Sequence, residues 1–141
     1  MIRKMQNTDI NRVADIWLKT NLKAHDFIPE QYWTSNYELV KEMMSQAEVY
    51  VYEDNKMIQG FVGLNNEYIE GIFVSDEMQS CGIGKLLLDY VKDKKVSLRL
   101  NVYQKNIRAL SFYQREGFDI QSEGLDDATG EKEYTMLWKQ K

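Results

Sequence analysis

Cysteine, proline and histidine each occur once in this chain of 141 residues, and long hydrophobic runs are missing. Cys81 has no second cysteine with which to form an internal disulfide, so a reducing cytosol is the simplest location. No apolar run approaches the roughly 20 residues that a membrane-spanning helix needs. The N-terminal MIRKMQNTDI also lacks the apolar centre of a secretion signal. We therefore expect a soluble, cytoplasmic protein with no membrane partner.

Positive charge is also scarce, because 18 lysines and arginines stand against 22 aspartates and glutamates, for a net charge of −4. This balance argues against a nucleic-acid binder, which must neutralise many phosphates. The hydrophobic share of 43% and the charged share of 28% are those of an ordinary soluble globular protein. A chain of this size buries roughly 70% of its unfolded surface. We expect residues 1–141 to form a single domain.

The hydrophobic periodicity predicts an α/β fold of the α+β kind, with about seven strands and four helices. Alternation with period two predicts strands at 2–5, 48–54, 56–64, 67–74, 96–103, around 120 and at 134–139. Helical spacing predicts four helices: one after a Thr8 cap, a second from Pro29 to Met44, a third from about Ile83 to Lys94 and a fourth from Asn106 to Glu116. On the third helix, Leu86 and Leu87 are expected to face the core. The helix between strands 67–74 and 96–103 implies that these two are parallel, so the sheet is mixed but mostly antiparallel.

The turn at Gly82-Ile83-Gly84 leads directly into the third predicted helix. A helix start offers unpaired N–H groups and a positive dipole end, and glycines let an anion approach that backbone closely. A dinucleotide fingerprint needs a third glycine where Leu87 stands, and a P-loop needs Ser or Thr after Lys85, where Leu86 stands. A phosphate-binding turn of another kind and a purely structural tight turn both remain open on this motif alone.

Two longer sequence patterns help to decide between a phosphate-binding turn and a structural turn. Gln79-Ser80-Cys81-Gly82-Ile83-Gly84 fits Gln/Arg-x-x-Gly-x-Gly/Ala, and a later segment fits Asn-x-x-Ala-x-x-Phe-Tyr-x-x-x-Gly-Phe with Asn106, Ala109, Phe112, Tyr113, Gly117 and Phe118. With both motifs in this order, the chain resembles the GNAT superfamily of N-acetyltransferases over nearly its whole length. The resemblance implies the GNAT fold, in which the strands at 67–74 and 96–103 splay apart, and acetyl-CoA as the donor.

The resemblance also implies where acetyl-CoA lies. Backbone groups around Ile72, Phe73 and Val74 are expected to bind the pantetheine arm, and the pyrophosphate is expected to lie among Gln79, Cys81, Gly82, Ile83, Gly84 and Lys85. Asn106 is expected to contact the coenzyme or to cap its helix. Tyr113 is expected to donate a proton to the departing thiolate, because a phenol stays protonated at neutral pH; simple packing of the ring is the alternative.

The general base and the acceptor site are less defined. Some GNAT members carry a glutamate where this chain has Tyr68, which makes Glu70 on the same strand the candidate base, with a solvated surface carboxylate as the alternative. His25, Phe27, Trp33 and Tyr68 are candidate substrate-binding residues, against capping and core packing as the plainer roles. We expect no metal, and a monomer or homodimer.

The expected reaction is acetyl transfer to a primary amine: a protein lysine, a protein N-terminus or a small-molecule amine. The segment His25-Asp26-Phe27-Ile28 resembles that of small bacterial GNAT proteins linked to protein lysine acetylation. The alternative function is a non-catalytic acyl-CoA sensor or interaction module that retains the coenzyme site.

Overall fold

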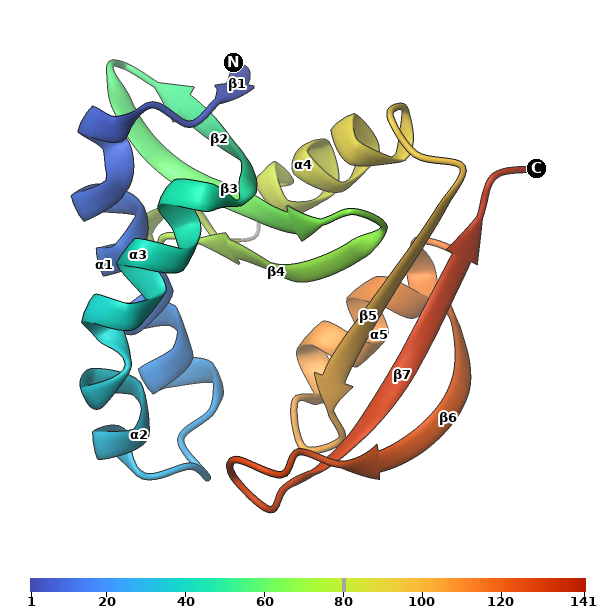
Figure 1. Ribbon diagram of the computed structural model, residues 1–141. Coiled ribbons are helices and arrows are strands. Elements are labelled where there is room, and N and C mark those ends of the chain that lie inside the picture. Colours follow the sequence, from blue (N-terminus) through green and yellow to red (C-terminus); the bar gives the residue numbers. More distant parts are fainter. Residues whose placement is uncertain (80) are drawn as a thin grey trace.

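The computed structural model describes residues 1–79 and 81–141, and within them seven strands form one sheet in the order β1-β2-β3-β4-β5-β7-β6 (Figure 1). The strands are β1 Ile2–Lys4, β2 Glu48–Asp54, β3 Met57–Asn65, β4 Tyr68–Val74, β5 Ser97–Tyr103, β6 Asp119–Leu125 and β7 Lys132–Lys139. The described helices are α1 Ile10–Ala24, α2 Glu30–Ser35, α3 Tyr37–Gln46, α4 Ile83–Lys92 and α5 Ile107–Arg115, with 3-10 turns η1 Asn7–Asp9 and η2 Asp76–Met78. The predicted mixed, mostly antiparallel sheet is confirmed.

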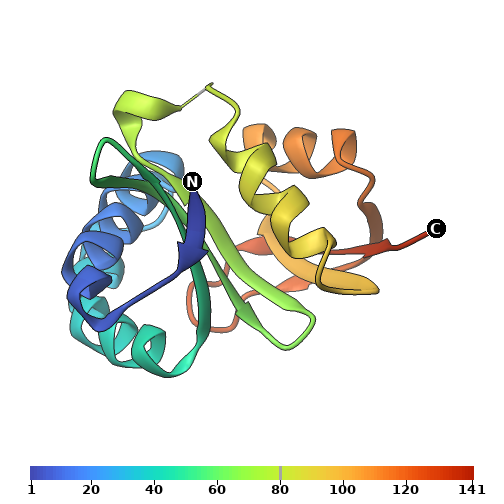
Figure 2. The ribbon, with the colours of Figure 1, turned by 90° about the horizontal axis from the view of Figure 1, so that it is seen from above.

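Two apolar layers cover the two faces of the sheet. On one face, α1 and α3 pack on the inner strands through Val13, Ile16, Met44, Val49, Val51, Ile58 and Phe61. On the other face, α4 and α5 pack through a second cluster that includes Leu87, Leu88, Val91, Tyr113 and Phe118. Figure 2 shows these two helix groups on opposite sides of the strands. Alternation along a strand sends successive side chains to opposite layers, as with Tyr50 between Val49 and Val51.

The centre of the sheet is where β4 and β5 meet in parallel and then diverge. Tyr68 pairs with Arg99, and the Arg99 N–H donates to the Glu67 carbonyl at 2.9 Å. Within the described residues this is the one pairing between β4 and β5, while β5 pairs with β7 along its whole length. The divergence is visible in Figure 1. We call the stretch beyond Tyr68 and Arg99 the strand opening; the predicted splay is confirmed.

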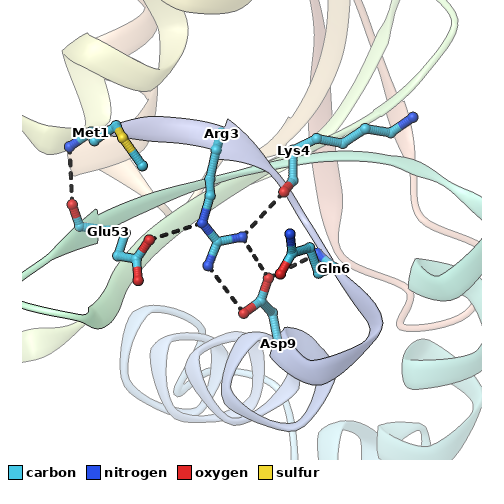
Figure 3. A network of polar contacts seen from close by, with 6 residues as sticks. All are labelled: Met1, Arg3, Lys4, Gln6, Asp9 and Glu53. Carbon is cyan, nitrogen blue, oxygen red and sulfur yellow. Dashed lines mark hydrogen bonds and ion pairs between the residues drawn. The ribbon is translucent and has the colours of Figure 1, made fainter.

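A charged network holds the short edge strand β1 against the sheet and the start of α1 (Figure 3). The Arg3 guanidinium donates to both carboxylate oxygens of Asp9, at 2.8 and 3.2 Å, and to Glu53 at 2.9 Å. The same carboxylate of Asp9 accepts the Gln6 N–H at 2.8 Å. The hydrogen bond from Arg3 lowers the pKa of Asp9, so this carboxyl stays ionised and the network stays intact at neutral pH.

The structure corrects the predicted helix from Pro29 to Met44. It is divided into α2 and α3 at Asn36, whose backbone (φ −96°, ψ 0°) lies between the two and whose side chain donates to the Tyr32 carbonyl at 2.6 Å. Pro29 is the extended residue before α2 rather than its first turn. The described chain therefore has five helices instead of the predicted four.

Two smaller predictions were also wrong. The residue before α1 is Asp9, not Thr8, because the Asp9 carboxylate closes the turn onto the Gln6 N–H. On α4 the buried face holds Leu87 and Leu88, whereas Leu86 is 49% exposed, so the core stripe is shifted by one residue. None of the described helices is long and apolar enough to cross a bilayer.

Candidate functional site

The loop before α4 is open and its backbone is accessible. Gly82 has φ +84° in the left-handed region, and a Cβ added there would meet no atom within 4 Å. Cys81 is exposed, whereas Ile83 is buried and anchors the helix start in the core. A Cβ on Gly84 would lie 3.6 Å from the Phe112 ring, an ordinary contact. The first-turn amides of α4 therefore begin beside open space, as anion binding requires; the motif residue Ser80 lies outside the described residues.

Three polar or charged side chains flank this loop: Gln79, Lys85 and Arg108. The Gln79 amide donates to the Val74 carbonyl at 3.1 Å and accepts from the Arg108 guanidinium at 3.0 Å. Arg108, from the first turn of α5, thus adds a positive charge beside the loop. No motif in the sequence had indicated this residue. The Lys85 ammonium instead pairs with Glu116 at 2.9 Å, an interaction that raises the pKa of Lys85 and already balances its charge.

The backbone of β4 presents alternate residues to the strand opening. The Ser75 N–H donates to the Gln59 carbonyl on the β3 side at 2.8 Å. Alternation of N–H groups along a strand then directs Phe73 toward β3, and Ile72 and Val74 toward the opening. Of the three predicted backbone positions, Ile72 and Val74 thus face the opening, where the Val74 carbonyl accepts from Gln79.

Gly71 fixes the side chain of Phe73. A Cβ on Gly71 would lie 2.4 Å from the Phe73 ring, far inside van der Waals contact. The ring therefore folds over Gly71, and it stacks on Phe61 with centroids 5.0 Å apart. No motif in the sequence marks Gly71, because this close approach involves a ring two residues away on the same strand.

A β-bulge at Glu70 shapes the start of the opening. Leu64 pairs with Ile69 and Gly63 with Gly71, which leaves Glu70 as the extra residue. Its Cβ lies on the same side as the Gly63 position, on the face that α1 covers, whereas Ile72 packs in the α4 layer. Strand alternation without a bulge would place Ile72 and Glu70 on the same face, so the bulge separates them.

The charges of two carboxyl groups act on Tyr68. Its pKa is raised first by burial and then by the charges of Glu70 and Glu133, while a hydrogen bond from the Asn101 backbone acts in the opposite direction. The Glu133 carboxylate also accepts from the Asn101 side-chain amide at 3.0 Å. Tyr68 from β4, Asn101 from β5 and Glu133 from β7 therefore meet where the strands begin to separate. Glu133 was not identified from the sequence.

Both carboxyl groups are adjusted toward proton acceptance. Glu70 is largely exposed, and partial desolvation raises its pKa; burial together with Asp126 and Asp127 raises the pKa of Glu133. A carboxylate with a raised pKa is a better base at neutral pH. Either group can therefore hold a proton taken from a nucleophile bound nearby.

Tyr113, on α5, lies in the core layer between that helix and the sheet. Its side chain is 7% exposed and packs edge-on against Phe112 and Phe118, with ring centroids at 5.2 and 5.5 Å. Burial, and to a lesser degree Tyr68, raises the pKa of Tyr113. The phenol is therefore protonated at neutral pH, which is the state that a general acid needs.

Aromatic rings close the far end of the opening. His25 and Phe27, from the segment after α1, contact the Tyr103 ring at the end of β5 with centroids 5.0 and 5.8 Å apart. His25 also stacks on Trp33 at 5.5 Å. The buried indole N–H of Trp33 has no hydrogen-bond partner among the described residues, a costly arrangement for a donor. The predicted acceptor-site residues 25, 27 and 33 are thus brought together with Tyr103.

The hairpin from β6 to β7 brings acidic groups to this cluster. The Tyr103 hydroxyl donates to Asp126 at 2.5 Å. Burial, and then the charge of Asp126, raises the pKa of Tyr32. In Figure 1 this hairpin loop and the loop after α1 approach each other at the lower edge of the view. Asp126 and Tyr103 were missed because nothing in the sequence shows that positions 25, 103 and 126 meet.

Parallel strands that separate beside an open glycine loop at a helix start match the fold that the resemblance to acyl-CoA-dependent N-acetyltransferases implies. A sequence profile of the family described as acetyltransferase (GNAT) domain matches residues 21–128. The chain belongs to the GNAT family of acetyltransferases. Its members use acetyl-CoA, so the predicted family and donor are both confirmed.

Known proteins resemble the chain along almost all of its length. The peptidyl-lysine N-acetyltransferase YiaC of Escherichia coli (strain K12) is 33% identical over 140 residues, which cover 98% of this chain and 96% of YiaC. The solution structure of apo YjaB from E. coli matches with a TM-score of 0.87 at 23% identity, covering 98% of this chain and 96% of that one. YncA from Salmonella typhimurium, determined with acetyl-CoA, matches with a TM-score of 0.70 at 16% identity, covering 99% and 92%.

Proposed function

We propose that this protein transfers the acetyl group of acetyl-CoA to the side-chain amine of lysine in a peptide or protein. The observation that carries the proposal is the 33% identity to a peptidyl-lysine N-acetyltransferase over nearly the entire chain. The acidic and aromatic groups at the strand opening support it, because a lysine side chain is a cation on an apolar stem.

The donor is held by two parts of the chain. The loop 79–85 and the first turn of α4 receive the pyrophosphate through main-chain N–H groups, with Arg108 adding charge. The pantetheine arm runs through the strand opening along the backbone of Ile72 and Val74 that faces it. Their N–H groups are then placed to stabilise the oxyanion that forms from the thioester carbonyl.

The acceptor must lose a proton before it can attack, since a free lysine amine has a pKa of about 10.4. Glu70, directly or through water, takes this proton, and Glu133 is the second carboxyl whose charge raises the pKa of Tyr68. The neutral amine nitrogen then forms a bond to the thioester carbon. The carbon–sulfur bond breaks as the tetrahedral intermediate collapses.

Tyr113 supplies the proton that the departing CoA thiolate takes up, and solvent later returns a proton to the phenolate. The burial that raises the pKa of Tyr113 also disfavours an anionic thiolate beside it, so transfer remains possible. Glu70 releases the first proton to solvent and then takes the second proton of the attacking amine. The products are an acetylated lysine, CoA with a free thiol and one released proton.

Mass spectrometry with isotope-labelled acetyl-CoA tests the proposal. Three acceptor pools are compared: peptides with a blocked N-terminus and free lysines, lysine-free peptides with a free N-terminus, and small polyamines. We expect label on lysine at least tenfold above the other two pools. Preferential labelling of N-termini or polyamines would overturn the lysine assignment, and tight acetyl-CoA binding with no transfer to any pool would favour the acyl-CoA sensor.

A further inference from the structure

A chain of hydrogen bonds runs from the start of α5 to the middle of α1, and its direction is fixed at every link. The Ala109 N–H donates to the Asn106 side-chain oxygen at 3.2 Å, so the Asn106 nitrogen faces His25 Nε2, at 2.9 Å. His25 Nδ1 lies 2.8 Å from the Asn21 side-chain oxygen, because the Asn21 nitrogen donates to the Trp17 carbonyl at 2.9 Å. Each amide therefore has its oxygen and nitrogen assigned by a backbone partner.

These assignments leave one state for the imidazole. Nδ1 must carry a hydrogen to donate to Asn21, and Nε2 must be bare to accept from Asn106. A second proton on the imidazole would have to bind at Nε2. The resulting Nε2–H donor would face the Asn106 N–H donor, and the hydrogen bond between them would be lost. The chain thus requires a neutral His25 in the Nδ1–H tautomer.

The chain joins the two parts of the fold that separate at the strand opening. His25 follows α1, which packs on the β2–β4 side, and Asn106 caps α5 after β5. At the near end of the opening the two parts meet at Tyr68 and Arg99; at the far end they meet through His25 on Asn106 and on the Tyr103 ring. The position of the α5 start is therefore tied to α1.

We propose that His25 is a positioning residue for acetyl transfer: its neutral imidazole holds Asn106, and through it the start of α5, the helix that carries Tyr113. The inference rests on the proposed function for its kinetic consequences but not for the state of the imidazole. His25 is not a base in this scheme, because both ring nitrogens are already engaged.

The surroundings of His25 keep it neutral. Burial lowers its pKa to about 4. Among the described neighbours, the Tyr103 phenol, whose ring contacts the imidazole, donates to Asp126, and the Lys105 ammonium lies 5.3 Å from the Phe27 ring. The carboxyl-bearing residue next in the chain, Asp26, is exposed to solvent. Burial is the cause of the lowered pKa, and it favours the neutral imidazole.

NMR of the imidazole tests its state directly, and the chain's only histidine gives a single set of ring signals. The ¹⁵N ring shifts of the full chain should report the Nδ1–H tautomer at pH 7, with no protonation above about pH 5. An Nε2–H tautomer, or titration near the ordinary value of about 6.5, would overturn the proposal without any reference to activity.

The variant Asn106→Asp tests the link between the two residues. Aspartate caps a helix as well as asparagine does, but its carboxylate can only accept, so the link can re-form only with a protonated imidazole. The His25 pKa should therefore rise above about 6.5, an increase of more than two units. An unchanged His25 titration would show that the two side chains are not coupled.

Three variants of His25 test positioning against simple stability. The amide of His25→Gln reaches the place of Nε2 and can accept from Asn106, whereas that of His25→Asn reaches only the place of Nδ1; His25→Phe keeps the ring alone. We expect His25→Phe and His25→Asn to lower kcat at least tenfold. The kcat of His25→Gln should stay within threefold of the wild-type value. The Kd for CoA should change less than threefold in all three variants. Equal losses in the Gln and Asn variants, or changes confined to the thermal midpoint, would overturn the proposal. A wild-type enzyme that acetylates no lysine would instead refute the proposed function and leave the NMR results valid.

Discussion

Gly82→Ala separates what the glycine does for folding from what it does for the coenzyme. Within the chain, the added Cβ meets no atom within 4 Å, so the cost to stability comes from the backbone at φ +84°. A left-handed conformation costs a residue with a Cβ about 1–2 kcal/mol. For a chain of this size that corresponds to a thermal midpoint lower by about 3–6 °C, which leaves the variant folded at 25 °C.

The effect on acetyl-CoA should be larger, because the same Cβ occupies the open space where the pyrophosphate is proposed to lie. Displacing the phosphate from one main-chain N–H removes a charge-assisted hydrogen bond, worth about 1.5–3 kcal/mol. At about 1.4 kcal/mol for each factor of ten, the Kd for acetyl-CoA should rise about 10- to 100-fold. Isothermal titration calorimetry on the folded variant measures this value.

Gly130→Ala is the matched control. Gly130 also has positive φ (+75°), a Cβ there would likewise meet nothing within 4 Å, and it lies in the β6–β7 hairpin away from the loop before α4. It should lower the thermal midpoint by a similar amount and leave acetyl-CoA binding unchanged. An unaltered Kd in Gly82→Ala, or an equal weakening in Gly130→Ala, would refute the reasoning about the loop.

Four other changes give distinct results. Tyr113→Phe should lower kcat about 10²–10⁴-fold with little change in the Kd for acetyl-CoA, and a normal single-turnover rate would remove the phenol from the mechanism. Arg108→Gln should weaken CoA binding about three- to tenfold and reduce its salt dependence, which titrations at two ionic strengths would test. Gly71→Ala should destabilise the fold by about 1–3 kcal/mol in urea unfolding, because the Phe73 ring must move; an unchanged midpoint would contradict the 2.4 Å overlap. Activity should fall as the pH drops through the raised pKa of Glu70, since the base must be ionised, and Glu70→Gln should remove that acidic limb from the pH profile of kcat/KM.

The elements that the sequence predicted well are those with local signals at both ends. The strand 48–54 was placed to the residue, because its alternation stops at a turn where Asn55 and Lys56 both take positive φ. Helix α5 begins after Asn106 and ends before Gly117, whose φ is +94°. Caps and turns of this kind are chosen by the residues themselves, so no tertiary information is needed.

The division between α2 and α3 had no such signal. The residues from 30 to 46 are compatible with one continuous helix, and the break at Asn36 depends on its side chain bonding back to Tyr32 while Trp33 is buried against the rings of Trp17 and His25. That packing is decided by residues distant in the sequence. Periodicity alone therefore could not reveal it.

The candidate site divides along the same line. The motif at residues 79–84 is contiguous in the chain, so it could be recognised from the sequence alone. The acceptor side combines residues from four separate segments, and the pairing of Tyr103 with Glu133 follows from the β5–β7 register, which the sequence does not state. The bulge at Glu70 likewise depends on how β3 pairs with β4.

Burial acts on the described groups of this site in one direction, toward the neutral form. It raises the pKa values of Tyr113, Tyr68 and Glu70 and lowers that of His25. A lysine ammonium that enters the same surroundings is subject to the same desolvation, which lowers its pKa and favours the free amine that attack requires. Two effects therefore favour deprotonation: the carboxylate accepts the proton, and the apolar surroundings lower the pKa of the ammonium. Because the second effect does not depend on Glu70, the variant Glu70→Gln should slow the reaction without abolishing it.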